Sequence, residues 1–190
     1  MPVKILVFGG SIRTGSLSAK LASLAAKEVA LLDTEVTHIS LADYPLPLYD
    51  GDLEAQKGVP ENAAKLARLM AAHTGVFVAT PEYNHSLPPL LKNTIDWVSR
   101  PKNAPGVSFR GRVFAIGSTS NGMIGGARAL IDLRKVLATA FNAVVVAEQV
   151  SISRAQDAFD EAGQLKDAAP AETLRTVAAR LVDLARRLHG

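Results

Sequence analysis

Cysteine is absent from this chain of 190 residues, which excludes disulfide bonds, thiol catalysis and cysteine-ligated metal sites. Long hydrophobic runs are also absent. No stretch approaches the roughly 20 apolar residues that cross a bilayer, and the N-terminal residues lack the flanks of a signal peptide. The 21 basic and 18 acidic residues are scattered, with a net charge of +3, which favours a solvated surface over a nucleic-acid interface. We therefore expect a cytoplasmic protein with no membrane span and no nucleic-acid partner.

Apolar residues make up 48% of the sequence, which suffices for a packed core, and the length fits a single domain over residues 1–190. Short β-branched runs alternate with amphipathic stretches. The runs that predict strands are Val3–Phe8, Thr34–Ser40, Gly75–Thr80, Arg112–Ser118 and Ala143–Ala147. The stretches with helical spacing of apolar residues are Ser16–Leu32, Pro60–His73, Pro88–Val98, Gly125–Phe141 and Pro170–Leu188. The segment Ala42–Val59 is expected to be a long loop.

Alternating strands and helices predict a doubly wound α/β fold, in which a five-stranded parallel sheet carries helices on both faces. Near-continuous apolar runs such as Val76–Val78 and Val144–Val146 suit strands that are covered on both sides. Polar loops that resemble ligand sites follow the first, third and fourth strands. Because ligands bind at the carboxyl edge where the strand order reverses, we expect the order 2-1-3-4-5 of flavodoxin-like folds.

The first polar loop places hydroxyl side chains and one arginine at the start of a helix. These residues are Ser11, Arg13, Ser16 and Ser18, and a helix N-terminus attracts anions through its free N–H groups and its dipole. The alternative is that Ser16 only caps the helix and that Gly9-Gly10 only makes a turn. The spacing fits neither the GxGxxG fingerprint nor a Walker loop, so we expect the phosphate of a mononucleotide rather than a pyrophosphate.

The second polar loop follows the third predicted strand and has the sequence Pro81-Glu82-Tyr83-Asn84. A flat ring such as an isoalloxazine needs apolar contact on its face and hydrogen bonds at its pyrimidine edge. Tyr83 supplies an aromatic face and Asn84 an amide. The alternative is a plain strand-to-helix connection whose tyrosine packs on the surface.

The histidines do not indicate a catalytic or metal site. His85 follows the second loop, but no hydrolase-like order of serine, histidine and aspartate accompanies it, so we expect it on the loop surface or at the edge of a ligand site. The histidines at 38, 73 and 189 have no partner at ligand spacing, and no metal is expected.

A third loop, Ser118–Gly126, follows the fourth predicted strand and is rich in hydroxyls and glycines. Glycines permit close approach of the backbone to a ligand. A flexible strand-to-helix connection is equally consistent with this segment taken alone. Three such loops at one edge of the sheet together favour a ligand site.

Several motifs, in order along nearly the whole chain, resemble those of the NADPH-dependent FMN reductase family, in the branch that includes quinone and chromate reductases. The motifs are Gly10-Ser-Ile-Arg-Thr-Gly-Ser16, Thr80-Pro-Glu-Tyr-Asn-His-Ser-Leu-Pro88, Leu91-Lys-Asn-Thr-Ile-Asp-Trp97, Gly122-Met-Ile-Gly-Gly126 and Phe159-Asp-Glu-Ala-Gly-Gln-Leu165. The combination of Ser-x-Arg-x-x-Ser with Pro-Glu-Tyr-Asn is the most specific part of the resemblance.

The resemblance implies a flavodoxin-like fold, FMN bound without a covalent link, and a homodimer or homotetramer with flavin sites near the subunit interface. It also implies roles for ten residues. The phosphate would be held by Ser11, Arg13, Ser16 and Ser18, the ring by Pro81, Glu82, Tyr83 and Asn84, and the site would be lined by Ser118 and Gly122.

The resulting prediction is an oxidoreductase in which NADPH or NADH reduces FMN, and the flavin then reduces a small-molecule acceptor such as a quinone, chromate, an azo compound or free flavin. A single small domain has no obvious second site for a nicotinamide cofactor, so successive use of one pocket, with ping-pong kinetics, is expected. Because the flavin carries the chemistry, no catalytic acid or base is assigned. Two alternatives are a flavodoxin-like electron carrier and a non-enzymatic module that binds FMN. Carriers of that kind tend to be acidic, whereas this chain has a pI near 9.3.

Overall fold

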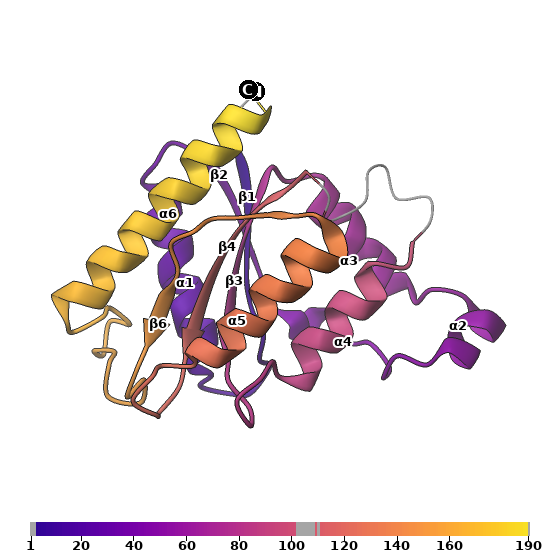
Figure 1. The fold of residues 1–190 in the computed structure, drawn as a ribbon, viewed down its shortest axis with the longest axis horizontal. Helices are drawn as coiled ribbons and strands as arrows, with labels where there is room; N and C mark the ends of the chain where they lie inside the picture. Colours follow the sequence, from indigo (N-terminus) through magenta and orange to yellow (C-terminus); the bar gives the residue numbers. More distant parts are fainter. Residues whose placement is uncertain (1–2, 102–108, 110, 190) are drawn as a thin grey trace.

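The computed structural model describes residues 3–101, 109 and 111–189, and its centre is a parallel β-sheet (Figure 1). The strands are β1 (Lys4–Gly9), β2 (Glu35–Ile39), β3 (Gly75–Pro81), β4 (Val113–Thr119), β5 (Val144–Val145) and β6 (Val150–Ile152). Their order is β2-β1-β3-β4-β5, with β6 also paired to β4. The predicted order 2-1-3-4-5 is therefore confirmed, and β6 is a sixth strand that the hydrophobic pattern did not predict.

Helices cover both faces of the sheet, as predicted. They are α1 (Leu17–Ala30), α2 (Gly51–Lys57), α3 (Glu61–Ala71), α4 (Pro89–Val98), α5 (Ala127–Lys135) and α6 (Ala168–His189). One apolar core lies between the sheet and the pair α1 and α6, and a second lies between the sheet and the helices α3, α4 and α5. Every residue of β4 is buried, because a central strand of such a sheet is covered on both sides.

The last predicted strand is wrong in its extent. Only Val144 and Val145 pair with β4, through Val113 and Phe114, whereas the strand was expected to run over Ala143–Ala147. The Arg134 guanidinium donates hydrogen bonds to the carbonyls of residues 145, 146 and 147. Those carbonyls are therefore satisfied by a side chain, and the chain returns to the sheet edge only at β6.

The segment expected to be a long loop contains two short helices, a 3₁₀ turn at Leu41–Asp43 and α2. The α2 helix is capped by Asp50, whose side-chain oxygen accepts hydrogen bonds from the N–H groups of Asp52 and Leu53. This helix has no buried residue and stands out from the body of the molecule beyond α4 (Figure 1). It consequently has no apolar stripe that could reveal it in the sequence.

Several helix boundaries also differ from expectation. The predicted helix Gly125–Phe141 is divided into α5 and a π-helical turn at Val136–Ala140. The last helix, α6, begins two residues before the expected Pro170, since proline is accepted in the first turn of a helix. Within the described residues, no helix is both long enough and apolar enough to cross a bilayer.

Candidate functional site

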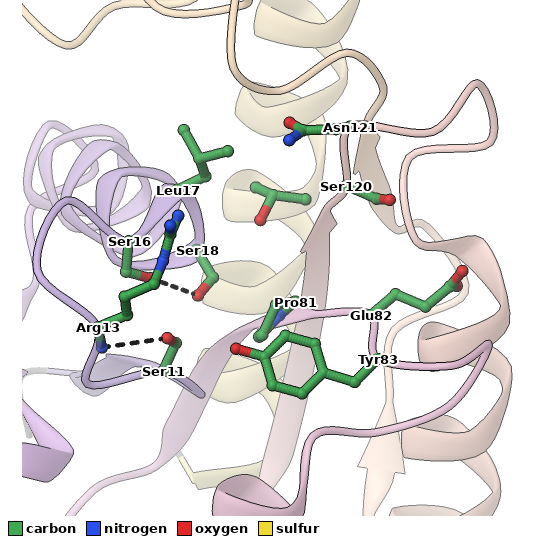
Figure 2. A pocket seen from close by; sticks show the side chains of 11 residues that line it. Ser11, Arg13, Ser16, Leu17, Ser18, Pro81, Glu82, Tyr83, Ser120 and Asn121 are labelled. Atoms are coloured by element: carbon green, nitrogen blue, oxygen red, sulfur yellow. Dashed lines mark hydrogen bonds between the residues drawn. The ribbon is translucent and has the colours of Figure 1, made fainter.

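The three polar loops meet at the carboxyl edge of the sheet around a cavity of about 320 Å³ (Figure 2). Parallel strands in register end side by side, since β1 pairs Gly9 with Ala79 of β3, and β3 pairs Thr80 with Ser118 of β4. The cavity is lined by Ser11, Arg13, Ser16, Leu17, Ser18, Pro81, Glu82, Tyr83, Thr119, Ser120 and Asn121. Its volume lies at the lower end of the roughly 300–1,000 Å³ typical of small-molecule sites.

The loop after β1 forms a wall rich in hydrogen-bond donors. The Ser16 hydroxyl caps α1 by accepting a hydrogen bond from the Ala19 N–H at 3.2 Å, and it lies 3.0 Å from the Ser18 hydroxyl. Both serines are buried. Among the described residues, the N–H groups of Leu17 and Ser18 have no acceptor, so the first turn of α1 keeps donors for a ligand.

Arg13 adds a positive charge to the same wall. Within the described part of the chain, its guanidinium makes no ion pair and no side-chain hydrogen bond. The neighbouring Ser11 hydroxyl accepts a hydrogen bond from the Arg13 N–H at 3.3 Å, and Arg13 O accepts one from Ser16 N–H at 3.0 Å. The turn is thereby fixed while the guanidinium stays available to an anion.

Tyr83 lies in a tight turn on the opposite wall. Its N–H and carbonyl exchange hydrogen bonds with Ser86, at 3.1 and 3.0 Å, and the two central residues, Asn84 and His85, adopt φ values of 49° and 65°. A two-residue turn with both centres left-handed matches the twist of paired strands, and asparagine is favoured in it. The Tyr83 side chain is 48% exposed, and its ring reaches across toward Ser11 (Figure 2).

Two side chains attach this turn to α5. The Glu82 carboxylate accepts hydrogen bonds from the N–H groups of Arg128 and Ala129 at 3.0 and 3.1 Å. The Ser86 hydroxyl donates to the Asp132 carboxylate at 2.6 Å. This hydrogen bond, with Lys135 as the second cause, lowers the pKa of Asp132 below its ordinary value. The turn is therefore held on the helix from both sides of Tyr83.

The loop after β4 closes the third side of the cavity. The Ser118 hydroxyl is fully buried and donates to the Gly125 carbonyl at 2.7 Å, so it shapes the loop from within. Ser120 N–H donates to the Ile152 carbonyl at 3.1 Å, and the Asn121 side-chain oxygen accepts from the Gln156 N–H at 3.1 Å. The chain that follows β6 thus supports the wall that Ser120 and Asn121 present to the cavity.

The structure brings seven of the ten residues assigned from the sequence to one cavity. They are Ser11, Arg13, Ser16, Ser18, Pro81, Glu82 and Tyr83. The other three residues lie outside its lining: Asn84 is at the tip of the turn, Ser118 points into the loop interior, and Gly122 is exposed on the loop. His85 is on the surface of the turn, where its Nδ1 accepts a hydrogen bond from Arg128 at 3.1 Å.

Four lining residues were missed from the sequence: Leu17, Thr119, Ser120 and Asn121. From the third loop the sequence suggested Ser118 and Gly122, whereas the cavity lining in this region consists of Thr119, Ser120 and Asn121. Since side chains alternate across a strand, the buried Ser118 turns away and Thr119 faces the cavity. The sequence did not indicate Leu17 as a lining residue, because an apolar residue at the start of an amphipathic helix is expected to pack in the hydrophobic core.

The chemistry of the lining fits a ligand with an anionic end and a flat end. Helix N–H donors and an arginine side chain, all without a partner among the described residues, gather with two serine hydroxyls on one wall, where a phosphate is favoured. A half-exposed aromatic ring and a proline lie on another wall, where a planar ring has apolar contact. The phosphate and isoalloxazine of FMN match these two ends in kind.

Comparisons with known proteins agree with this chemistry. The family model for NADPH-dependent FMN reductases matches residues 3–157. An NAD(P)H-dependent FMN reductase of Pseudomonas aeruginosa is 37% identical over 189 residues, which cover 99% of this chain and 98% of that protein. A quinone reductase of Escherichia coli is 38% identical over 136 residues, 71% of this chain and 69% of that protein. The solved flavoenzyme NAD(P)H:acceptor oxidoreductase of Paracoccus denitrificans superposes with a TM-score of 0.81 at 29% identity, covering 97% of this chain and 98% of that one.

Proposed function

This chain belongs to the NADPH-dependent FMN reductase family, and from that membership we propose that it is an NAD(P)H-dependent oxidoreductase that uses FMN to reduce quinones or similar flat acceptors. The observation that carries the proposal is that one cavity at the carboxyl edge of the sheet has serine hydroxyls and Arg13 on one wall and the Tyr83 ring on another. Relatives named as quinone reductases and as a 2-hydroxy-1,4-benzoquinone reductase support the acceptor class.

The phosphate of FMN is assigned to the wall after β1. Arg13 supplies the charge, and the hydroxyls of Ser11, Ser16 and Ser18 supply donors that rotate to suit the phosphate oxygens. The N–H groups of the first turn of α1 add the positive end of the helix dipole. Anion binding to these groups needs no rearrangement of the loop, because the Ser16 cap already fixes it.

The isoalloxazine is assigned to the wall formed by Pro81 and Tyr83, with Thr119, Ser120 and Asn121 on the facing side. The tight turn holds the Tyr83 ring in place. Asn84 supports this wall in two ways: its left-handed backbone forms the turn, and its exposed amide is assigned to the edge of the ring. Ser118 and Gly122 act through the shape of the loop that carries Ser120 and Asn121.

When bound, FMN supplies the hydride chemistry, and the residues of the chain bind it, orient it and limit what reaches it. Tyr83 is half exposed at the mouth of the cavity, so donor and acceptor approach the ring from the same open side. NADPH or NADH and the acceptor therefore use one place in turn, which gives ping-pong kinetics. No side chain in the lining is assigned as an acid or base.

Steady-state kinetics test the proposal. Oxidation of NADPH by the FMN-loaded protein is measured at several fixed concentrations of 1,4-benzoquinone, and the same series is repeated with NADH. The expected result is turnover that depends on FMN, with parallel lines in double-reciprocal plots. Intersecting lines would show that donor and acceptor bind together, and absence of turnover with bound FMN would remove the enzymatic assignment.

We further propose that the protein works in the cytoplasm as a homodimer or homotetramer. Exposed apolar side chains near the site support assembly: Tyr83, Met123 and Ile124 are 48%, 82% and 45% exposed. Such residues usually mark an interaction surface when they gather around a functional site. Light scattering on the purified protein gives the mass of the particle. A mass equal to that of one chain at working concentration would contradict the proposed homodimer or homotetramer.

A further inference from the structure

Glu82 carries a carboxylate that is almost completely removed from solvent. The residue directly follows β3, and its side chain is only 8% exposed. A buried carboxylate is costly unless hydrogen bonds or charges satisfy it. Here the N–H groups of Arg128 and Ala129 both donate to one carboxylate oxygen, so the charge is placed at the positive end of α5.

The α5 helix has no side-chain cap in its own sequence. Its N-cap residue, Gly126, has a φ of 85° and makes no side-chain hydrogen bond. A Cβ atom added to Gly126 would lie 3.0 Å from the Ser118 Cβ and 3.4 Å from the Glu82 Cβ. The glycine therefore leaves room for Glu82, which supplies from another loop the acceptor that a serine or aspartate at the N-cap normally provides.

A second contact repeats the attachment one turn further along the same helix. The Ser86 hydroxyl donates to Asp132 at 2.6 Å. Glu82 lies directly before Tyr83, and Ser86 is the last residue of the turn that Tyr83 begins. The two contacts with α5 therefore lie on either side of Tyr83 in the chain. The position of Tyr83 is consequently set by contacts with α5 and not by the cavity alone.

Glu82 lines the cavity, but its carboxylate is directed away from the side chains that face the ligand. The Glu82 carboxylate points away from the wall of Ser11 and Arg13, whereas the Tyr83 ring points toward it (Figure 2). The α5 helix begins where the loop bearing Ser120 and Asn121 ends. A bond from Glu82 to α5 therefore joins the Tyr83 wall to the Ser120 wall.

We propose that Glu82 is a positioning residue that fixes the spacing of the two walls around the flavin ring by capping α5. The proposal rests on the assignment of FMN to this cavity and goes beyond it, because it gives Glu82 a role through α5 rather than through contact with the ring. Capping of α5 needs a side-chain oxygen at position 82 that accepts the two N–H groups, and the negative charge of Glu82 matters less for the cap than this oxygen.

Three variants test the proposal: Glu82→Ala, Glu82→Gln and Asp50→Ala. The alanine variant removes the acceptor, the glutamine variant keeps an oxygen without the charge, and Asp50→Ala removes a comparable carboxylate cap from α2, which contributes no residue to the cavity. Three properties are measured: hydrogen exchange of the Arg128 and Ala129 amides, FMN affinity, and the visible absorption spectrum of bound FMN.

In the FMN-free Glu82→Ala variant, the folded-to-unfolded ratio is expected to fall roughly 5- to 30-fold, as for other lost caps. The two amides exchange faster, FMN binds more weakly, and the bound spectrum shifts because the ring environment has changed. Glu82→Gln stays within roughly fivefold of the wild type in FMN affinity, since only the charge–dipole attraction is lost. Asp50→Ala loses stability but keeps the FMN affinity and spectrum.

Two results would overturn the proposal. One is a Glu82→Ala protein with unchanged FMN affinity and spectrum. The other is a Glu82→Gln protein that binds FMN as poorly as Glu82→Ala while its amides remain protected, because the charge would then contact the ligand itself. If Glu82→Ala does not fold, Ser86→Ala, which removes the second contact of the turn with α5, is measured instead; the proposal then requires a shift of its bound FMN spectrum relative to the wild type, and an unchanged spectrum overturns it. A wild type that binds no FMN would refute the proposed function as well, so the two failures are distinguishable.

Discussion

The hydroxyl oxygens of Ser16 and Ser18 lie 3.0 Å apart in the first turn of α1. The Ser16 oxygen accepts the Ala19 N–H, and both serines are buried beside N–H groups that have no acceptor among the described residues. An anion at this place gains several donors without any change in the backbone, which is the arrangement expected of a preorganised phosphate site.

Removal of the Arg13 charge should weaken FMN binding. Arg13→Ala loses a charge-assisted contact with the phosphate, worth about 1.5–3 kcal/mol, and the effect should shrink as salt is added. FMN titration by flavin fluorescence measures it. Lys20→Ala is the matched control, because Lys20 is an exposed cation on α1 outside the cavity lining. Equal losses in both variants would mean that only the overall field of the protein matters.

The aromatic face of Tyr83, rather than its hydroxyl, should support ring binding. Tyr83→Ala is expected to weaken the binding of FMN and of riboflavin alike by about 0.5–1.5 kcal/mol, since both ligands carry the ring. Tyr83→Phe keeps the face and should bind both normally. Titration with the two ligands separates this effect from that of Arg13→Ala, which should spare riboflavin. A defect in Tyr83→Phe would instead assign a role to the hydroxyl.

Gly125 should not tolerate a side chain. Its φ is 63°, and an added Cβ would lie 2.8 Å from the backbone nitrogen of Ser153, so Gly125→Ala must displace the loop that carries Ser120 and Asn121. Gly163→Ala is the control, because Gly163 has a φ of 75° but nothing within 4 Å.

The control variant should lose about 1–2 kcal/mol of unfolding free energy from its left-handed backbone. Gly125→Ala should lose about 1–3 kcal/mol more through overpacking, and it alone should bind FMN more weakly. Urea denaturation and FMN titration measure the two effects. Equal stability of the two variants would show that the contact between this loop and the chain after β6 is loose.

The hydrogen bond from Ser86 to Asp132 should make stability depend on pH in the acid range. The pKa of Asp132 in the folded protein lies below its ordinary value of 3.8, first because of Ser86 and then because of Lys135. A depressed carboxyl pKa stabilises the fold fully above the unfolded value, and the contribution is lost as pH falls through the folded pKa.

Asp132→Asn should therefore be less stable than the wild type at neutral pH, and the difference should shrink below pH 3.8. Urea denaturation of both proteins at several pH values measures it, and NMR titration of the carboxyl group in Ser86→Ala should show the pKa of Asp132 rising. A stability difference that is independent of pH would mean that the charge of Asp132 plays no part.

The central sheet was predictable from the sequence because its buried strands are short, β-branched and separated by amphipathic helices. The same pattern failed for β6 and α2. The β6 strand has only three residues, Val150–Ile152, too few to show the alternation of a strand, and before it the Val146 carbonyl accepts a hydrogen bond from the Arg134 guanidinium. The α2 helix buries no residue, and it is held by polar contacts, such as the Asp50 cap and the hydrogen bond from the Tyr49 hydroxyl to Glu54, rather than by a hydrophobic face.

The walls of the site after β1 and β3 were predictable because polar residues at the ends of adjacent parallel strands must converge. Which side chains of a loop face inward was not predictable. Ser118 and Thr119 have similar chemistry, and only the pleat of β4 turns Thr119 toward the cavity. The role of Glu82 was also hidden, since its partners Arg128 and Ala129 are 46 and 47 residues away in the chain.

An anaerobic reduction of the FMN-loaded protein by NADPH, followed by absorbance, tests the central claim most directly. Free FMN is first removed, so that only bound flavin is observed. The account predicts that the bands of oxidised flavin bleach on addition of NADPH and return when a quinone is added. Bound flavin that stays oxidised in the presence of NADPH and NADH would contradict the assignment of this chain as an FMN-dependent reductase.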